Sequence, residues 1–88
     1  MSEAKTTTHH DEIKRWAEAR QGMPARVKTP GHEGGILRID FGEPEETLER
    51  IDWDEFFKIF DENNLQFLYQ ERTEDGGVSR FNKFIRQD

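Results

Sequence analysis

The sequence of 88 residues contains no cysteine and no long run of apolar residues. Without cysteine the chain has no disulfide framework, no thiolate zinc site and no cysteine nucleophile. No apolar run approaches the roughly 18–20 residues of a membrane span, so no membrane association is expected. The first eight residues also lack the apolar segment of a signal peptide, which leads us to expect a cytoplasmic protein.

Hydrophobic residues are scarce as well, at 32% of the chain, whereas charged residues make up 36%. These two values are typical of disordered chains. The aromatic content of 11% argues in the other direction, because disordered chains are poor in aromatic residues. Most of the aromatic residues lie between Phe41 and Phe84, where we expect a folded body. The sequence therefore predicts a single domain over residues 9–88, preceded by a flexible tail at residues 1–8.

The net charge of −6 is unevenly distributed along the chain. From Met1 to Arg38, seven basic and five acidic residues give +2, whereas from Ile39 to Asp88, six basic and fourteen acidic residues give −8. The whole protein is therefore not expected to be held on nucleic acid by long-range attraction. The basic half still permits a local basic surface.

Residues 9–21 have the pattern of an amphipathic helix. Thr8 and Asp11 have the spacing of a capping box in which Thr8 is the N-cap. Four residues recur at the spacing of one helical face: Ile13, Trp16, Ala17 and Arg20. Gly22 is expected to end the helix as a glycine in the left-handed conformation, and Pro24 cannot continue it.

The segment that begins at Asp52 gives the strongest helix signal. Asp52 is the predicted N-cap, with Glu55 at the third helical position, and Ile51 and Phe56 have the spacing of a hydrophobic staple. One face of this helix is apolar: Trp53, Phe56, Phe57 and Phe60. We interpret this stripe as core packing, because so small a domain needs every large apolar residue inside. Asn63 and Asn64 offer a left-handed residue at the helix end.

Five segments have strand patterns or are compatible with strands: residues 25–28, 36–41, 47–51, 65–71 and 78–86. The first two are expected to pair as a hairpin, and the last two as a hairpin closed by a turn around Asp75 and Gly76. In the last strand we place Phe81 and Ile85 on one face, with Phe81 in the core, and Phe84 on the other face. The predicted fold class is α+β: one antiparallel sheet of three to five strands with two helices packed on one face.

The second face of this predicted sheet carries few apolar residues: Ile36, Leu68 and Phe84. An exposed patch of these side chains would indicate a dimer or a docking site. The sequence leaves the oligomeric state open.

Six segments resemble a family of small, uncharacterised bacterial proteins: residues 10–13, 15–18, 24–27, 35–41, 53–57 and 65–70. The resemblance extends over nearly the whole chain from His10 onward. Members of this family often carry the label 1,4-α-glucan branching enzyme. Such enzymes resemble the (β/α)₈ glycoside hydrolases, whose barrel takes about 250 residues and whose chemistry needs two carboxyl groups across a sugar site. An 88-residue chain cannot contain that barrel, so the resemblance implies kinship and carries over no activity and no functional residue.

No constellation of residues indicates catalysis, a metal or a cofactor. Imidazole and carboxylate groups such as His9, His10, Asp11 and His32 suit zinc or nickel. The adjacent His9 and His10, however, would point to different sides of a helical turn. The acidic residues at 40–62 lack the spacing of a calcium loop, and the glycine-rich residues 29–35 match no phosphate-binding motif, although such loops can cradle an anion. We therefore predict no catalytic residue, no metal ligand and no cofactor, and we favour a protein that is not an enzyme.

Basic and aromatic residues suggest two alternative kinds of partner. Interface hot spots are rich in Trp and Arg, and five such residues form the candidate interface: Arg15, Trp16, Arg20, Arg26 and Arg38. Core packing is the competing interpretation of Trp16. We expect a small non-enzymatic binding or adaptor module that contacts another protein. The alternative is a nucleic-acid-binding domain that uses the basic N-terminal half and the C-terminal hairpin, where residues 79–84 interleave basic and aromatic side chains.

Overall fold

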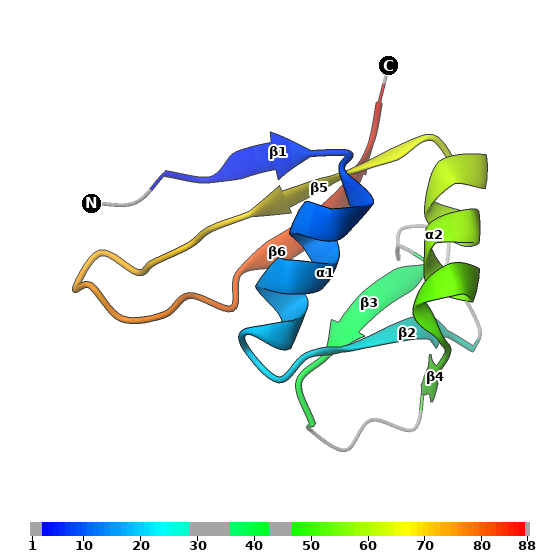
Figure 1. Cartoon of the computed structure of the whole chain (residues 1–88), viewed down its shortest axis with the longest axis horizontal. Coiled ribbons are helices and arrows are strands. Elements are labelled where there is room, and N and C mark those ends of the chain that lie inside the picture. The colour runs from blue at the N-terminus through cyan, green and yellow to red at the C-terminus, as the bar shows by residue number, and fades with distance from the viewer. Residues whose placement is uncertain (1–2, 29–35, 43–46, 88) are drawn as a thin grey trace.

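A computed structural model describes residues 3–28, 36–42 and 47–87 of the chain. Six strands and two helices follow one another within these residues (Figure 1). In chain order they are β1 (Lys5–Thr7), α1 (His10–Glu18), β2 (Met23–Val27), β3 (Leu37–Asp40), β4 (Leu48–Arg50), α2 (Trp53–Glu62), β5 (Leu65–Tyr69) and β6 (Asn82–Arg86). The α+β class predicted from the sequence is confirmed.

The strands form two antiparallel sheets of three strands each, and the prediction of one sheet is corrected accordingly. Sheet A has the strand order β1-β5-β6, and sheet B has the order β3-β2-β4. Alternation of apolar and polar residues shows that a strand has one buried face, but it does not show which strand lies beside it. The number of sheets therefore could not be read from the pattern.

Strand β1 forms one edge of sheet A, within the stretch that the sequence predicts as a tail. It pairs with β5 in a register that sets Thr6 opposite Leu68 and Thr7 opposite Phe67. Thr7 is buried, at 8% exposure. Threonine favours strands, but this segment has no alternating apolar residues, so the strand gave almost no signal in the sequence.

Strand β2 is the centre of sheet B although it contains a proline. Pro24 has no N–H to donate, yet its carbonyl accepts a hydrogen bond from the Ile51 N–H at 3.1 Å. Pro24 lies opposite Ile39 in β3, so both side chains are on the same face of sheet B, and both are buried. This face of sheet B is turned toward the core.

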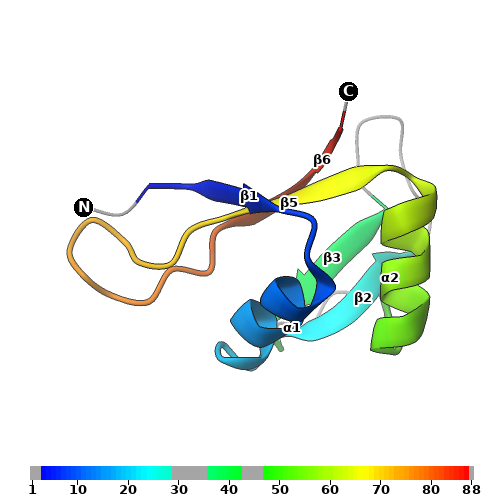
Figure 2. The same ribbon diagram turned by 45° about the horizontal axis from the view of Figure 1, so that its top comes forward.

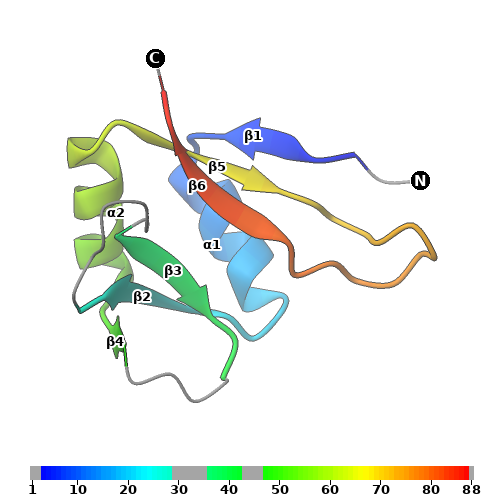
Figure 3. The ribbon, with the colours of Figure 1, turned by 180° about the vertical axis from the view of Figure 1, so that it is seen from behind.

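Both helices and sheet B lie on one side of sheet A (Figures 2 and 3). The core between these layers consists of nine buried residues: Ile13, Trp16, Ala17, Leu37, Ile39, Phe56, Phe60, Phe67 and Tyr69. Partly buried side chains, Phe84 of β6 among them, pack against this cluster. No described helix or strand covers the opposite side of sheet A.

The start of α1 differs from the predicted capping box by one residue. His9 is the N-cap and its side chain makes no capping hydrogen bond. Thr7, rather than Thr8, supplies the hydroxyl: it accepts from the His9 N–H at 3.0 Å and donates to Glu12 Oε1 at 2.6 Å. A threonine hydroxyl still organises the entry to the helix, but it does so from the end of β1.

The end of α1 also differs from the prediction, because Gln21 and not Gly22 has the left-handed backbone, at φ 58°. Gly22 is required for a different reason. A Cβ placed on it would lie 2.5 Å from Ile39 Cγ2 and 3.0 Å from Phe41 Cε1. The glycine therefore permits close packing of the turn against β3.

Helix α2 begins as predicted. The Asp52 carboxylate accepts a hydrogen bond from the Glu55 N–H at 2.7 Å. Phe56 and Phe60 are buried in the core, which confirms the assignment of the aromatic stripe. After the helix Asn64 adopts the left-handed conformation, at φ 52°.

The predicted C-terminal hairpin is confirmed, and it contains an irregularity near its base. The pairing continues beyond the ends of β5 and β6. The Gln70 N–H donates to the Phe81 carbonyl at 3.3 Å, and Arg72 and Val78 form an isolated antiparallel β-bridge. Between these two pairs, the single residue Glu71 lies opposite two residues, Ser79 and Arg80, which is the arrangement of a β-bulge. The bulge interrupts the alternation of the two faces at Ser79 and Arg80.

Candidate functional site

Two of the five predicted interface residues are buried. Trp16 is 4% exposed and Arg20 is 8% exposed. The Trp16 ring packs edge-on against Phe67 and Tyr69, and its Nε1–H donates to the Gln70 carbonyl at 3.1 Å. The competing interpretation of Trp16 as a core residue is the one that the structure supports.

Arg20 connects α1 to the C-terminal hairpin. Its guanidinium donates to three carbonyl oxygens: those of Ser79 at 2.6 Å, Trp16 at 2.9 Å and Glu71 at 2.9 Å. It also lies 4.3 Å from the centre of the Trp16 ring. Burial lowers the pKa of Arg20 from its ordinary value, which the nearby Glu71 carboxylate opposes. An arginine remains protonated despite such a shift, so Arg20 keeps its charge. We call Arg20 with its three carbonyl partners the Arg20 clamp.

The three other predicted residues are exposed but do not form one surface. Arg26 pairs with Glu49 at 2.6 Å, whereas Arg38 lies on the opposite face of sheet B, beside Ala25 in the ladder. Arg15 is exposed on α1. The predicted interface is therefore divided among separate parts of the molecule.

No described helix or strand lies on the side of sheet A that faces away from both helices (Figure 2). We call this side the outer face of sheet A. Successive side chains along a strand point to opposite faces of its sheet. Thr7, Phe67 and Tyr69 are buried and Phe84 packs against the core, so the residues that alternate with them point to the outer face. They are Thr6, Gln66, Leu68, Gln70, Arg72, Val78, Phe81, Lys83 and Ile85.

Apolar side chains are exposed on this outer face. Val78 is 60% exposed and Phe81 is 48% exposed, and these are two of the three large hydrophobic residues that are exposed among the described residues. Leu68 and Ile85, which are partly buried, lie farther along the same face. An exposed aromatic side chain in a chain with only 32% hydrophobic residues is not explained by core packing.

The charges of the outer face are all positive. Arg72 and Lys83 give +2, and none of the outer-face residues in sheet A and the described hairpin is acidic. The acidic residues of the hairpin lie elsewhere: Glu71 has its carboxylate 3.5 Å from the buried Arg20 guanidinium, and Glu74 and Asp75 lie at the tip. The Asp75 carboxylate accepts hydrogen bonds from the Thr73 hydroxyl and the Gly77 N–H, so it is held within the turn.

The base of the hairpin is held by polar contacts that fix the direction of Phe81. Ser79 is 3% exposed; its hydroxyl donates to Gln70 Oε1 at 2.8 Å and accepts from the Phe81 N–H at 3.1 Å. Unlike Phe81, Arg80 is directed toward the core side, where its guanidinium lies 5.3 Å from the centre of the Phe41 ring. The Arg20 clamp holds the same segment from the core side. Phe81 is therefore presented from a fixed backbone.

Phe81 and Phe84 lie on opposite faces of the strand as predicted, but the predicted core face and second face are exchanged. Phe84 packs against Phe56, Phe60 and Phe67, with ring centres 5.1–6.2 Å apart, whereas Phe81 faces outward. The alternation is visible in the sequence. The pairing of distant segments decides on which side of sheet A the helices pack. No local pattern in the sequence indicates that side.

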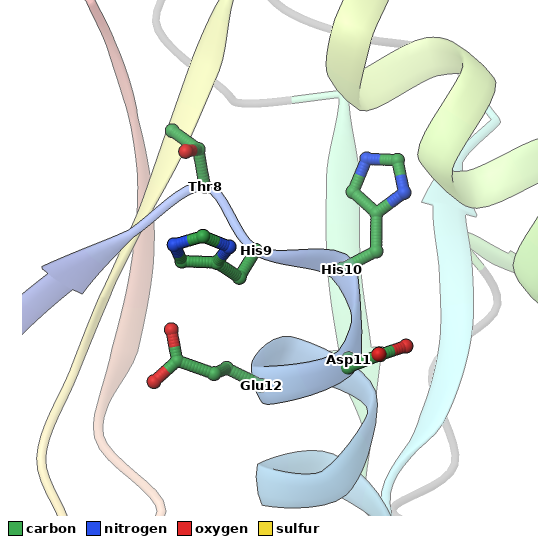
Figure 4. A pocket seen from close by; sticks show the side chains of 5 residues that line it. All are labelled: Thr8, His9, His10, Asp11 and Glu12. Atoms are coloured by element: carbon green, nitrogen blue, oxygen red, sulfur yellow. The ribbon is translucent and has the colours of Figure 1, made fainter.

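The histidines at the start of α1 diverge as the sequence predicts (Figure 4). Beside Thr8 and Glu12 they line a shallow pocket. His10 stacks on Phe57 with ring centres 4.1 Å apart, and its Nε2 lies 2.9 Å from Asp61 Oδ1. No group of three or more metal-ligating side chains occurs within residues 3–28, 36–42 and 47–87. His10 therefore connects the two helices.

The glycine-rich loop and its His32 lie outside the described residues. Searches against protein-family models, curated proteins and solved structures found no match to this chain. Neither described helix is long and apolar enough to cross a membrane.

Proposed function

We propose that the protein is a small binding module that contacts another protein through the outer face of sheet A. The observation that carries this proposal is the exposure of Phe81 and Val78 on a sheet face that no described helix or strand covers. Aromatic residues are enriched at the centres of protein interfaces, where acidic residues are depleted. The outer face has both properties.

The buried members of the predicted interface support this surface from behind. Trp16 and Arg20 bind the backbone of the hairpin at Gln70, Glu71 and Ser79, directly under the rungs that carry Phe81. A rigid anchor loses less conformational entropy on binding than a mobile one. Trp16 and Arg20 would therefore contribute to binding by positioning the hairpin.

Site-specific photo-crosslinking tests this proposal. A photoreactive phenylalanine analogue replaces Phe81 in the full chain, expressed in the cells that make the protein. The matched control carries the analogue at Lys14, an exposed position on α1, away from the outer face. We expect a discrete crosslinked protein from position 81 and none from position 14. Equal products at the two positions, or no product at position 81, would contradict the proposal.

Binding of single-stranded nucleic acid to the same face is the second candidate, and one observation favours it. Phe81 is exposed and Lys83 follows it on the same face, so a base could stack beside a cation. Two facts weigh against it: Arg80 points to Phe41 instead of joining this face, and the chain carries a net charge of −6. Fluorescence anisotropy with a thymidine oligonucleotide at about 50 mM salt tests this candidate, and no binding under that condition removes it.

A further inference from the structure

The outer face of sheet A has a charge pattern that restricts its partner. Among the described residues of this face, Arg72 and Lys83 are the charged ones, while the whole chain has a net charge of −6. The other polar residues of this face are uncharged: Thr6, Gln66 and Gln70. A surface of one charge attracts and selects partners that carry the opposite charge, and it repels partners of like charge.

The apolar and basic groups are interleaved along the hairpin. Lys83 lies in one rung with Leu68 and Thr6, and the neighbouring rungs carry Ile85 on one side and Phe81 on the other. Arg72 and Val78 form the outermost rung. No acidic side chain among the described residues lies within ion-pair distance of Lys83. Lys83 thus stands among apolar groups with its charge unmatched within the described structure.

We propose that the partner on this face is an acidic protein segment that also carries large apolar side chains; this inference rests on the protein-binding function proposed above. The apolar side chains of the segment pack against Leu68, Phe81 and Ile85, and one of its carboxylates lies beside Lys83. The carboxylate that meets Lys83 supplies the countercharge that the described structure lacks.

Two other occupants fit this charge pattern less well. A second copy that docked its own outer face here would bring two faces of charge +2 together, which is unfavourable. A nucleic acid carries a phosphate at every nucleotide, so most of its charge would meet a strongly acidic protein rather than the two cations. A peptide segment places a few carboxylates where the cations are and leaves the rest neutral.

Selection from a random peptide library on the immobilised full chain tests this inference. We expect the selected peptides to be enriched in Asp and Glu together with Leu, Phe or Trp. The Lys83→Glu variant is expected to lose the enrichment of acidic residues and to bind the best wild-type peptide about tenfold more weakly, as anisotropy measures. The Lys14→Glu variant makes the same charge change on α1 and is expected to select and bind as the wild type does.

The outcomes separate this inference from the proposed function. Selected peptides without acidic residues that still block crosslinking at position 81 would overturn the acidic class and leave the protein-binding function standing. An acidic selection that Lys83→Glu does not alter would overturn the inference too, and so would no selection above background. Displacement of the peptides by a thymidine oligonucleotide at lower concentration would overturn it in favour of nucleic acid. The crosslinking experiment decides the proposed function independently.

Discussion

Arg20 illustrates how a residue that resembles an interface residue in the sequence becomes a structural one. It shares a helical face with Trp16, and this combination is typical both of binding hot spots and of a core residue with an aliphatic stem. In the structure the guanidinium donates hydrogen bonds to the carbonyl oxygens of Trp16, Glu71 and Ser79. Glu71 and Ser79 lie more than fifty residues away along the chain, so no local pattern indicated that they would contact Arg20.

Replacing Arg20 with lysine should destabilise the fold. A lysine ammonium cannot reproduce the planar fork that reaches three carbonyls and stacks on Trp16. We expect Arg20→Lys to lower the free energy of unfolding by about 2 kcal/mol, because buried carbonyls are left without donors. Urea denaturation measures this loss, with Arg15→Lys, at an exposed site on the same helix, expected to stay within about 0.5 kcal/mol of the wild type. A loss for Arg20→Lys no larger than that of the control would show that the clamp contributes little.

Tyr69 is expected to titrate above the ordinary range of tyrosine. Burial is the main cause of its raised pKa, and the carboxylates of Glu12 and Glu71 add to it. Because the folded state favours the neutral phenol, this contribution to stability is complete below about pH 10 and is lost as the pH rises through the pKa of the folded state. Tyr69 is the only tyrosine, so phenolate absorbance reports on it alone. A midpoint equal to that of the urea-unfolded chain would contradict its burial.

Among the secondary-structure elements, α2 could be predicted almost completely because all of its signals are local. The Asp52 cap, the buried Phe56 and Phe60 and the left-handed Asn64 are all encoded within a few residues. Helix α1 was located correctly but with shifted ends, because its cap comes from Thr7 of a neighbouring strand. Strand β1 depends entirely on its pairing with β5, so no local pattern indicated it.

The turn after α1 offers a prediction at the level of the element. Gln21 has a positive φ, which costs a residue with a Cβ about 1 kcal/mol relative to glycine. Gln21→Gly should therefore raise the free energy of unfolding by up to about 1 kcal/mol. Gly22→Ala should lower it by about 2 kcal/mol, because the added methyl group collides with Ile39 and Phe41. Urea denaturation of the two variants measures both effects. If Gly22→Ala were neutral and Gln21→Gly destabilising, the predicted roles of the two residues would have to be exchanged.

For the whole molecule, the sequence indicated the class of fold and the alternation of apolar and polar residues in each main strand. It did not indicate how the strands are distributed between two sheets. One sheet of up to five strands satisfies the same alternation as two sheets of three. The candidate site could be predicted only in part for the same reason. Leu68 was correctly expected on the second face, whereas Phe84 was placed there and Phe81 was placed in the core. Only the position of the helices on one side of sheet A distinguishes the outer face from the core face.

The orientation of sheet A can be tested with a matched pair of substitutions in β6 and the residue before it. Phe84 packs against three core rings, so Phe84→Ala should lower the free energy of unfolding by about 2–3 kcal/mol. Phe81 is half exposed, so Phe81→Ala should cost less than about 1 kcal/mol while it removes binding to the outer face. Urea denaturation gives the stability of each variant, and affinity for a peptide selected on the wild type gives the binding. Since the two residues are close in sequence and chemically identical, only the side of the sheet that each faces can make their effects differ. The reverse order of stability losses would place the core on the other side of sheet A, and the outer face would then lose its exposed aromatic side chain.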